Sequence, residues 1–96
     1  MLESLKAQFI ADKVSGTAPL TVKFTDQSLG GSSILKREWD FGDGSAVVYD
    51  EMTPTHQYAS TGNFDVTLTI TRSDGKQDIA VKNELINVYR RVMVLP

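Results

Sequence analysis

The 96-residue sequence contains no cysteine, a single histidine and a single tryptophan. The lack of cysteine excludes disulfides, thiol nucleophiles and most structural zinc sites. His56 has no cysteine or second histidine to share a metal with, and no serine stands in a Gly-x-Ser-x-Gly nucleophile elbow. A chain this short also offers no deep cleft for a pair of catalytic carboxyl groups. The sequence therefore predicts a module that is not an enzyme.

Strong charge of one sign and long apolar runs are also absent. Ten basic and twelve acidic residues give a net charge of -2, and no stripe of Lys and Arg could follow a phosphate backbone. The apolar tail Val92–Leu95 is far too short to cross a bilayer. Residues Met1–Lys6 lack the basic and apolar regions of a signal peptide. Neither nucleic acid nor membrane insertion is expected.

The dominant pattern is an alternation of apolar and polar residues, which is typical of half-buried β-strands. It is clearest between Asn63 and Thr71 and recurs in Leu20–Thr25 and Leu35–Phe41. Weaker candidate strands are residues 7–11, 47–49, 55–58, 78–82 and 85–89, with a bulge expected at Asn83-Glu84 between the last two. No stretch shows helical periodicity. The pattern predicts one domain, a β-sandwich or barrel of about seven or eight strands.

Short turn signals separate these strands. Ser15–Pro19, Gly30–Ser33, Gly42–Ser45 and Ser60–Gly62 are rich in Gly, Ser and Pro. Ser73-Asp74-Gly75 predicts a hairpin, because Asp-Gly accepts the positive φ angles of a tight primed turn.

Three segments in this order closely resemble the polycystic kidney disease (PKD) repeat. They are Gly16–Ser28, Trp39–Gly44 (Trp-Asp-Phe-Gly-Asp-Gly), and His56–Tyr58 followed by Gly62–Leu68. The resemblance covers about residues 7–88 and implies an all-β, immunoglobulin-like antiparallel β-sandwich of about seven to eight strands. It further implies a non-catalytic module of exported proteins such as bacterial proteases, collagenases and chitinases, associated with protein or carbohydrate contact. Departures are mild: Phe64 replaces a common Tyr, and the Leu29–Ser33 loop is short.

These features define the expected boundaries and surroundings of the domain. Residues 1–6 are expected to be a leading segment or linker, residues 7–89 the sandwich, and residues 90–96 a tail or linker to a following domain. The resemblance places the module outside the cell or on its surface, excised without its signal peptide, with other domains of its parent protein as partners. A monomer is expected, with self-association through the apolar tail (Val88, Val92, Val94, Leu95) as the alternative.

Within the motif, Trp39 and Phe41 lie on the apolar face of their strand and are expected in the core. The alternative is an exposed Trp39 that stacks on a sugar ring. Gly42 and Gly44 are expected to form a sharp reversal in which Asp43 bonds backbone N–H groups, while Asp40 anchors a neighbouring loop.

Calcium is the one cofactor that the sequence leaves open. Asp40 and Asp43, with Asp12 or Asp26, would supply the hard oxygen ligands that calcium prefers. Some collagenase members of the resembling family bind calcium, but the spacing does not match a helix-loop-helix calcium loop.

His56 and Tyr58 precede the strongest strand, where immunoglobulin-like sandwiches place a corner tyrosine. Tyr58 is expected to bond back to the chain through its hydroxyl. For His56 we expect a hydrogen bond at the same corner, against the alternatives of metal ligand or general base.

Two functions follow from these observations. The first is a spacer or adhesion module that contacts protein through a sheet face or an edge strand. The polar face of that sheet is rich in threonine (Thr21, Thr25, Thr67, Thr69, Thr71). The second is a carbohydrate-binding module of a secreted hydrolase, which presents Tyr49 or Tyr89 to a polysaccharide.

Overall fold

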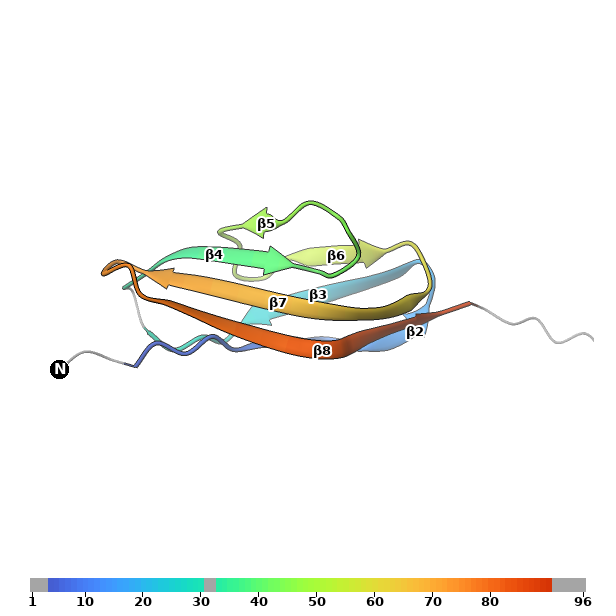
Figure 1. Ribbon diagram of the computed structural model, residues 1–96. Coiled ribbons are helices and arrows are strands. Elements are labelled where there is room, and N and C mark those ends of the chain that lie inside the picture. Colours follow the sequence, from blue (N-terminus) through green and yellow to red (C-terminus); the bar gives the residue numbers. More distant parts are fainter. Residues whose placement is uncertain (1–3, 31–32, 91–96) are drawn as a thin grey trace, which may run out of the picture.

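The computed structural model describes residues 4–30 and 33–90 and shows a sandwich of two β-sheets (Figure 1). Within these described residues, the eight strands are β1 (Phe9–Ala11), β2 (Ser15–Thr17), β3 (Leu20–Asp26), β4 (Ile34–Asp40), β5 (Val48–Tyr49), β6 (Thr55–Tyr58), β7 (Gly62–Arg72) and β8 (Gln77–Tyr89). One sheet has the order β1-β3-β6 and the other the order β2-β8-β7-β4-β5. The expected all-β sandwich is confirmed.

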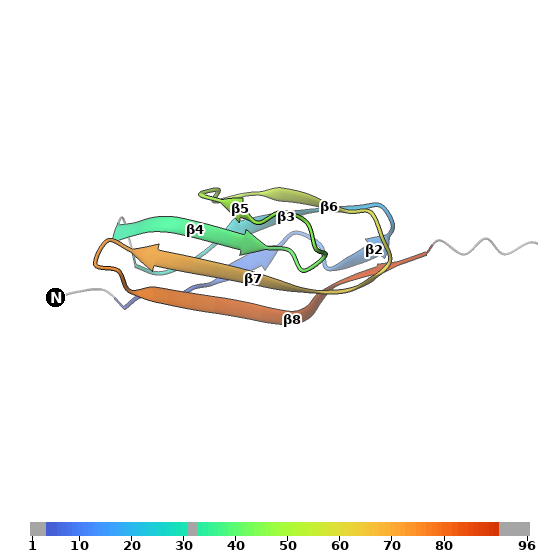
Figure 2. The ribbon, with the colours of Figure 1, turned by 45° about the horizontal axis from the view of Figure 1, so that its top comes forward.

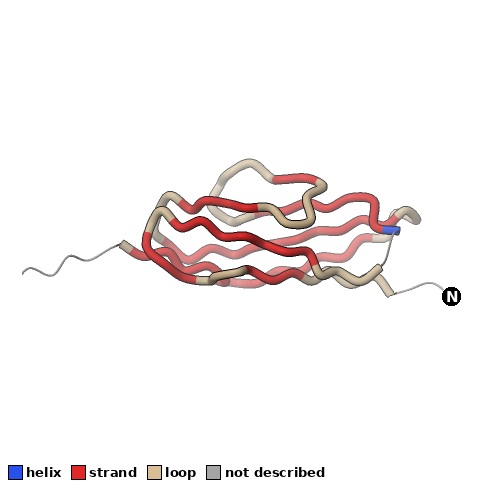
Figure 3. The backbone as a smooth tube through the Cα atoms, turned by 180° about the vertical axis from the view of Figure 1, so that it is seen from behind, coloured by secondary structure: helices blue, strands red, loops and turns tan. Residues whose placement is uncertain are grey.

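The core lies between the two sheets, which Figures 2 and 3 show from two further directions with their strands running along a common axis. The alternation predicted from sequence supplies the core, because every second residue of β3 and β7 points inward. The buried apolar residues are Ala7, Phe9, Leu20, Val22, Phe24, Trp39, Phe41, Tyr58, Val66, Leu68, Ile70, Ile86 and Val88. At their centre, the Phe9 and Trp39 rings meet edge to face, 5.4 Å apart.

Strand β8 is a single strand of 13 residues, where the sequence predicted two pieces. The bulge expected at Asn83-Glu84 is present: the register against β7 shifts between Phe64 and Val66, and Glu84 has a φ of 50°. The Asp65 carboxylate accepts the Glu84 N–H at 2.7 Å. A side chain of β7 thus satisfies the backbone that the bulge displaces, and the strand continues through it.

The segment Ser15–Thr17 was predicted as a turn and is instead strand β2, which pairs in parallel with Asn87–Tyr89. The expected antiparallel sandwich therefore contains a parallel pair. Both Ser15 and Thr17 are exposed, so the strand has no apolar alternation to reveal it. Its pairing depends on a strand about seventy residues away in sequence. The Ala18-Pro19 peptide bond that follows is cis.

The hairpin between β7 and β8 is present, but the predicted primed turn is wrong. The loop comprises Ser73–Lys76, and Gly75 has a positive φ (88°) while Asp74 does not. The Gly75 N–H donates to the Arg72 carbonyl at 2.8 Å. The Asp74 carboxylate accepts bonds from the Arg72 guanidinium (2.8 Å) and the Lys76 N–H (3.0 Å), which support a wider loop. These contacts, led by the Arg72 bond, lower the pKa of Asp74 to about 2.

The chain joins the sandwich slightly before residue 7. Lys6 and Leu29 exchange two backbone hydrogen bonds (2.9 and 2.8 Å), and Leu5 packs against the core. The tail Val92–Leu95 lies outside the described residues. Within the part of the chain that the structure describes, no helix is long and apolar enough to span a membrane.

Candidate functional site

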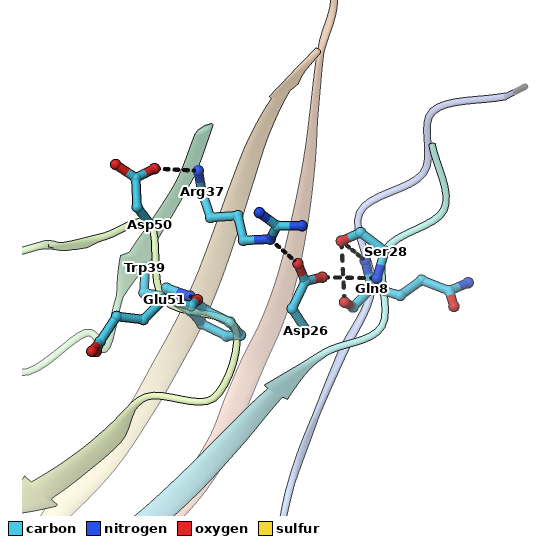
Figure 4. A network of polar contacts seen from close by, with 7 residues as sticks. All are labelled: Gln8, Asp26, Ser28, Arg37, Trp39, Asp50 and Glu51. Carbon is cyan, nitrogen blue, oxygen red and sulfur yellow. Dashed lines mark hydrogen bonds and ion pairs between the residues drawn. The ribbon is translucent and has the colours of Figure 1, made fainter. Parts of the chain in front are cut away.

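The aromatic residues of the motif are part of the core. Trp39, on β4, is 0% exposed, and its indole N–H donates to the Glu51 carbonyl at 2.7 Å (Figure 4). Phe41 is also buried, and the two rings are stacked 6.3 Å apart. The alternative of a sugar platform at Trp39 is wrong, because neither face of the indole reaches solvent.

After β4 the chain reverses through Gly42 and Gly44, each with a φ of 82°. Gly42 is required for a second reason: a Cβ atom there would lie 2.0 Å from the Asp65 carbonyl oxygen of β7. A Cβ atom at Gly44 would have nothing within 4 Å. The Asp40 carboxylate accepts the Gly42 N–H at 2.9 Å, so it fixes the start of this same loop and not of a neighbouring one.

Asp43 holds the loop together and joins it to β6. Its Oδ1 atom accepts the Ser45 N–H (3.1 Å) and the Ser45 hydroxyl (2.5 Å), and its Oδ2 atom lies 2.7 Å from His56 Nε2. Partial burial acts to raise the pKa of Asp43, but the hydrogen bonds from Ser45 and His56 and the charge of His56 outweigh it and lower the pKa. The sequence predicted the loop bonds of Asp43 and a hydrogen bond of His56 at this corner, but not that these two side chains are partners.

His56 and Tyr58 complete a corner cluster, which we define as Phe41, Asp43, Ser45, His56 and Tyr58. The His56 ring stacks on the Phe41 ring at 4.3 Å with an interplanar angle of 8°. The buried Tyr58 hydroxyl donates to the Phe41 carbonyl at 2.9 Å, so this tyrosine bonds back to the chain as expected. Burial raises the pKa of Tyr58, and the nearby charges of Asp43 and Asp40 raise it further. The phenol therefore stays protonated as a donor.

The third motif segment reaches the same corner. Gly62 begins β7 with a φ of 149°, and a Cβ atom there would lie 3.1 Å from the Phe64 ring. The Phe64 ring stacks on Tyr58 with centroids 4.8 Å apart. The second and third motif segments therefore pack against each other at this corner.

The corner cluster contains serine, histidine and aspartate, yet its geometry is not that of a catalytic triad. Asp43 Oδ2 and Ser45 Oγ approach the same ring atom, His56 Nε2, at 2.7 and 3.5 Å. A triad needs the acid on one ring nitrogen and the nucleophile on the other, so that the ring can pass a proton between them. Here the serine hydroxyl donates to the aspartate directly. The arrangement stabilises a loop.

Asp26, one of the calcium candidates, belongs to a separate network that joins the two sheets (Figure 4). Its Oδ2 atom pairs with Arg37 Nε across from β3 to β4, and its Oδ1 atom accepts the Ser28 N–H at 2.8 Å. The Ser28 hydroxyl donates to the Gln8 carbonyl at 3.3 Å. The Asp26 side chain is almost fully buried. Sequence reasoning missed Arg37, although the alternation of its strand places it on the same face as Trp39, two residues later.

The four candidate calcium ligands have different partners. Asp12 accepts the Lys23 N–H at 2.9 Å, Asp26 pairs with Arg37, and Asp40 and Asp43 bond their own loop. Among residues 4–30 and 33–90, no group of three or more His, Cys, Asp and Glu side chains is placed to hold a metal ion. Calcium binding stays a prediction to be tested by experiment.

Comparison with known proteins places these features in a family. The family model of the PKD domain matches residues 6–87. The chain belongs to the PKD domain family. A microbial collagenase of Vibrio alginolyticus is 43% identical over 58 residues, which are 60% of this chain and 7% of the collagenase. The chain thus spans a small part of the curated relatives that it matches.

Solved structures agree with the PKD sandwich. The PKD1 domain of the Vibrio cholerae metalloprotease PrtV superposes with a TM-score of 0.69 at 27% identity, over 88% of this chain and 98% of that domain. A structure reported for the promiscuous specificity of carbohydrate-binding modules of the β-sandwich superfamily gives a TM-score of 0.79 at 26% identity, over 91% of this chain and 35% of that chain.

Proposed function

We propose that this PKD domain is a non-catalytic accessory module of a larger exported or cell-surface protein, in which it spaces other domains or makes adhesive protein contact. The observation that carries the proposal is that the motif residues make their contacts within the domain. Trp39 and Phe41 are core residues, and Asp40, Asp43 and Tyr58 all bond backbone within the domain. No buried side-chain polar atom among the described residues lacks a partner.

The relatives support this role. In the collagenase and in the PrtV precursor, the matching region is 7% of the protein, so the PKD domain accompanies much larger sequences there. One is named a collagenase and the other a pre-pro-metalloprotease, which supports an exported parent protein for this chain. Its partners would then be the neighbouring domains and an external protein surface.

A carbohydrate-binding role is the second candidate, because a structural neighbour comes from carbohydrate-binding modules and two tyrosines are exposed. Tyr49 is 51% and Tyr89 54% exposed. They lie on β5 and β8, which β4 and β7 separate, so about 14 Å divides their strands. Lys36 Nζ also lies 5.1 Å from the Tyr49 ring centroid. The two rings therefore do not form one platform, and protein contact is favoured.

Retention on insoluble collagen, chitin and cellulose separates the two functions. We expect no retention on chitin or cellulose, because Tyr49 and Tyr89, the exposed tyrosines among the described residues, do not form one platform. Retention on collagen would identify a protein contact. A domain that binds none of the three materials would fit the spacer role. Binding to chitin or cellulose that Tyr49→Ala abolishes and Tyr49→Phe preserves would overturn the proposal in favour of the carbohydrate-binding role.

A further inference from the structure

Strand β8 has an open edge along its first half. On one side it pairs with β7 over its whole length, but on the other side β2 covers only Asn87–Tyr89 of its 13 residues. Residues 77–82 therefore have no strand on their outer side within the described part of the chain. Such an edge presents unpaired backbone donors and acceptors to another strand.

The register shows which residues present them. The Arg37 carbonyl accepts the Asp50 N–H, so the backbone groups of Arg37 point toward β5. The backbone groups of the next residue, Glu38, therefore point toward β7, where Glu38 lies opposite Thr69. Since backbone groups alternate along a strand, the even-numbered residues of β7 bond β8. Their partners are Asp78, Ala80 and Lys82. Ile79 and Val81 consequently direct their N–H and C=O groups to the open edge.

The side chains of this edge are divided between two faces. Ile79 and Val81 are 57% and 53% exposed on the outer face of the sheet. On the inner side, Asp78 accepts the Ala7 N–H and Lys82 Nζ donates to the Phe9 carbonyl, each at 2.7 Å. A groove of about 540 Å³ runs between this edge and the β1 side. The edge is therefore accessible and carries opposite charges at its two ends.

We propose that two copies of this chain pair antiparallel through Asp78–Lys82, about a two-fold axis at Ala80. In that register Ile79 lies opposite Val81 twice, and Asp78 lies opposite Lys82 twice. Asp78 keeps a second carboxylate oxygen and Lys82 keeps two further N–H donors for the partner copy. Moving the axis to Ile79 or Val81 loses both charge pairs and leaves a single apolar pair, in which the axis residue lies opposite its own copy. The edge is thus complementary to itself in a single register.

The pairing would join the two larger sheets into one continuous sheet. About five residues a side is well below the 20–30 residues of a standard interface, so we expect a dissociation constant weaker than about 1 µM. The sequence alone favoured a monomer, and this contact replaces that expectation at high concentration. It needs no ligand of the parent protein, so its failure would leave the proposed accessory role intact.

Sedimentation equilibrium of the 96-residue chain, from about 10 µM to about 1 mM, tests the pairing. We expect the mass average to rise toward that of a dimer. Ile79→Lys should abolish this rise, because it places a lysine opposite Val81 at both ends. Leu35→Lys is the matched control: Leu35 is 68% exposed on β4, away from the edge. Thermal melts establish that both variants fold.

A mixture tests the register itself. Val81→Glu alone should also abolish pairing, but a mixture of Ile79→Lys and Val81→Glu chains should restore it, because the introduced lysine then faces the introduced glutamate. A mixture that remains monomeric would overturn the register. A wild-type chain that stays monomeric at about 1 mM, or one that Leu35→Lys disrupts equally, would overturn the pairing.

Truncation after Arg90 tests whether the second copy binds through its apolar tail instead of its β8 edge. We expect the truncated chain to associate as the full chain does, since the paired edge comprises Asp78–Lys82. Loss of association on truncation would assign the contact to Val92–Leu95 of the second copy and overturn the proposal.

Discussion

At the scale of single residues, Gly42 and Gly44 have the same φ of 82° but different surroundings. We expect Gly44→Ala to cost about 1–2 kcal/mol, the price of a left-handed alanine. Gly42→Ala should cost roughly 3 kcal/mol or more, because its methyl group also meets the Asp65 carbonyl. Urea denaturation of both variants measures the difference. Equal midpoints would show that the close approach to β7 has no energetic weight.

Asp43 gives a pH-dependent prediction at the same scale. Its folded-state pKa lies below the unfolded value of about 3.9, so its contribution to stability is present above that value and is lost as pH falls through the folded pKa. Asp43→Asn should destabilise the fold by about 1–3 kcal/mol at neutral pH. The difference from wild type should shrink as pH is lowered below about 4. Urea titrations at several pH values test this, and parallel stability curves would contradict it.

At the scale of elements, the Asp26–Arg37 pair connects β3 of one sheet with β4 of the other. Asp26→Ala leaves the Arg37 guanidinium without its buried partner and should cost about 3–5 kcal/mol. The double variant Asp26→Leu/Arg37→Met should recover most of this loss, since apolar residues can replace a buried ion pair. Chemical denaturation of the single and double variants measures the coupling. A double variant no more stable than Asp26→Ala would indicate that the pair has no apolar substitute.

At the scale of the whole molecule, calcium binding can be tested through the thermal stability of the domain. The carboxylates of Asp12, Asp26, Asp40 and Asp43 already accept hydrogen bonds within the domain and have separate partners. We therefore expect the same thermal midpoint in excess chelator and in millimolar calcium. A ligand that binds only the folded state would raise the midpoint. A thermal midpoint that rises with calcium but not with magnesium would establish a calcium site.

Much of the fold was determined by the sequence alone. The alternation in β3 and β7 predicts the buried faces because a strand repeats every two residues, and the three motif segments identify the PKD family. Trp39 and Phe41 follow from the same alternation. The reversal at Gly42 and the bulge at Glu84 were also predicted from the sequence. Glycine and an interrupted alternation indicate an unusual backbone conformation at their own position.

The tertiary structure decided what depends on contacts between distant segments. The contact between Asp43 and His56, the pair of Asp26 with Arg37, and the parallel strand β2 each join residues that sequence spacing does not relate. The open edge of β8 is of the same kind, because a strand's pattern records its buried face and not the number of its neighbours. That edge exists because β2 is three residues long and β8 is thirteen.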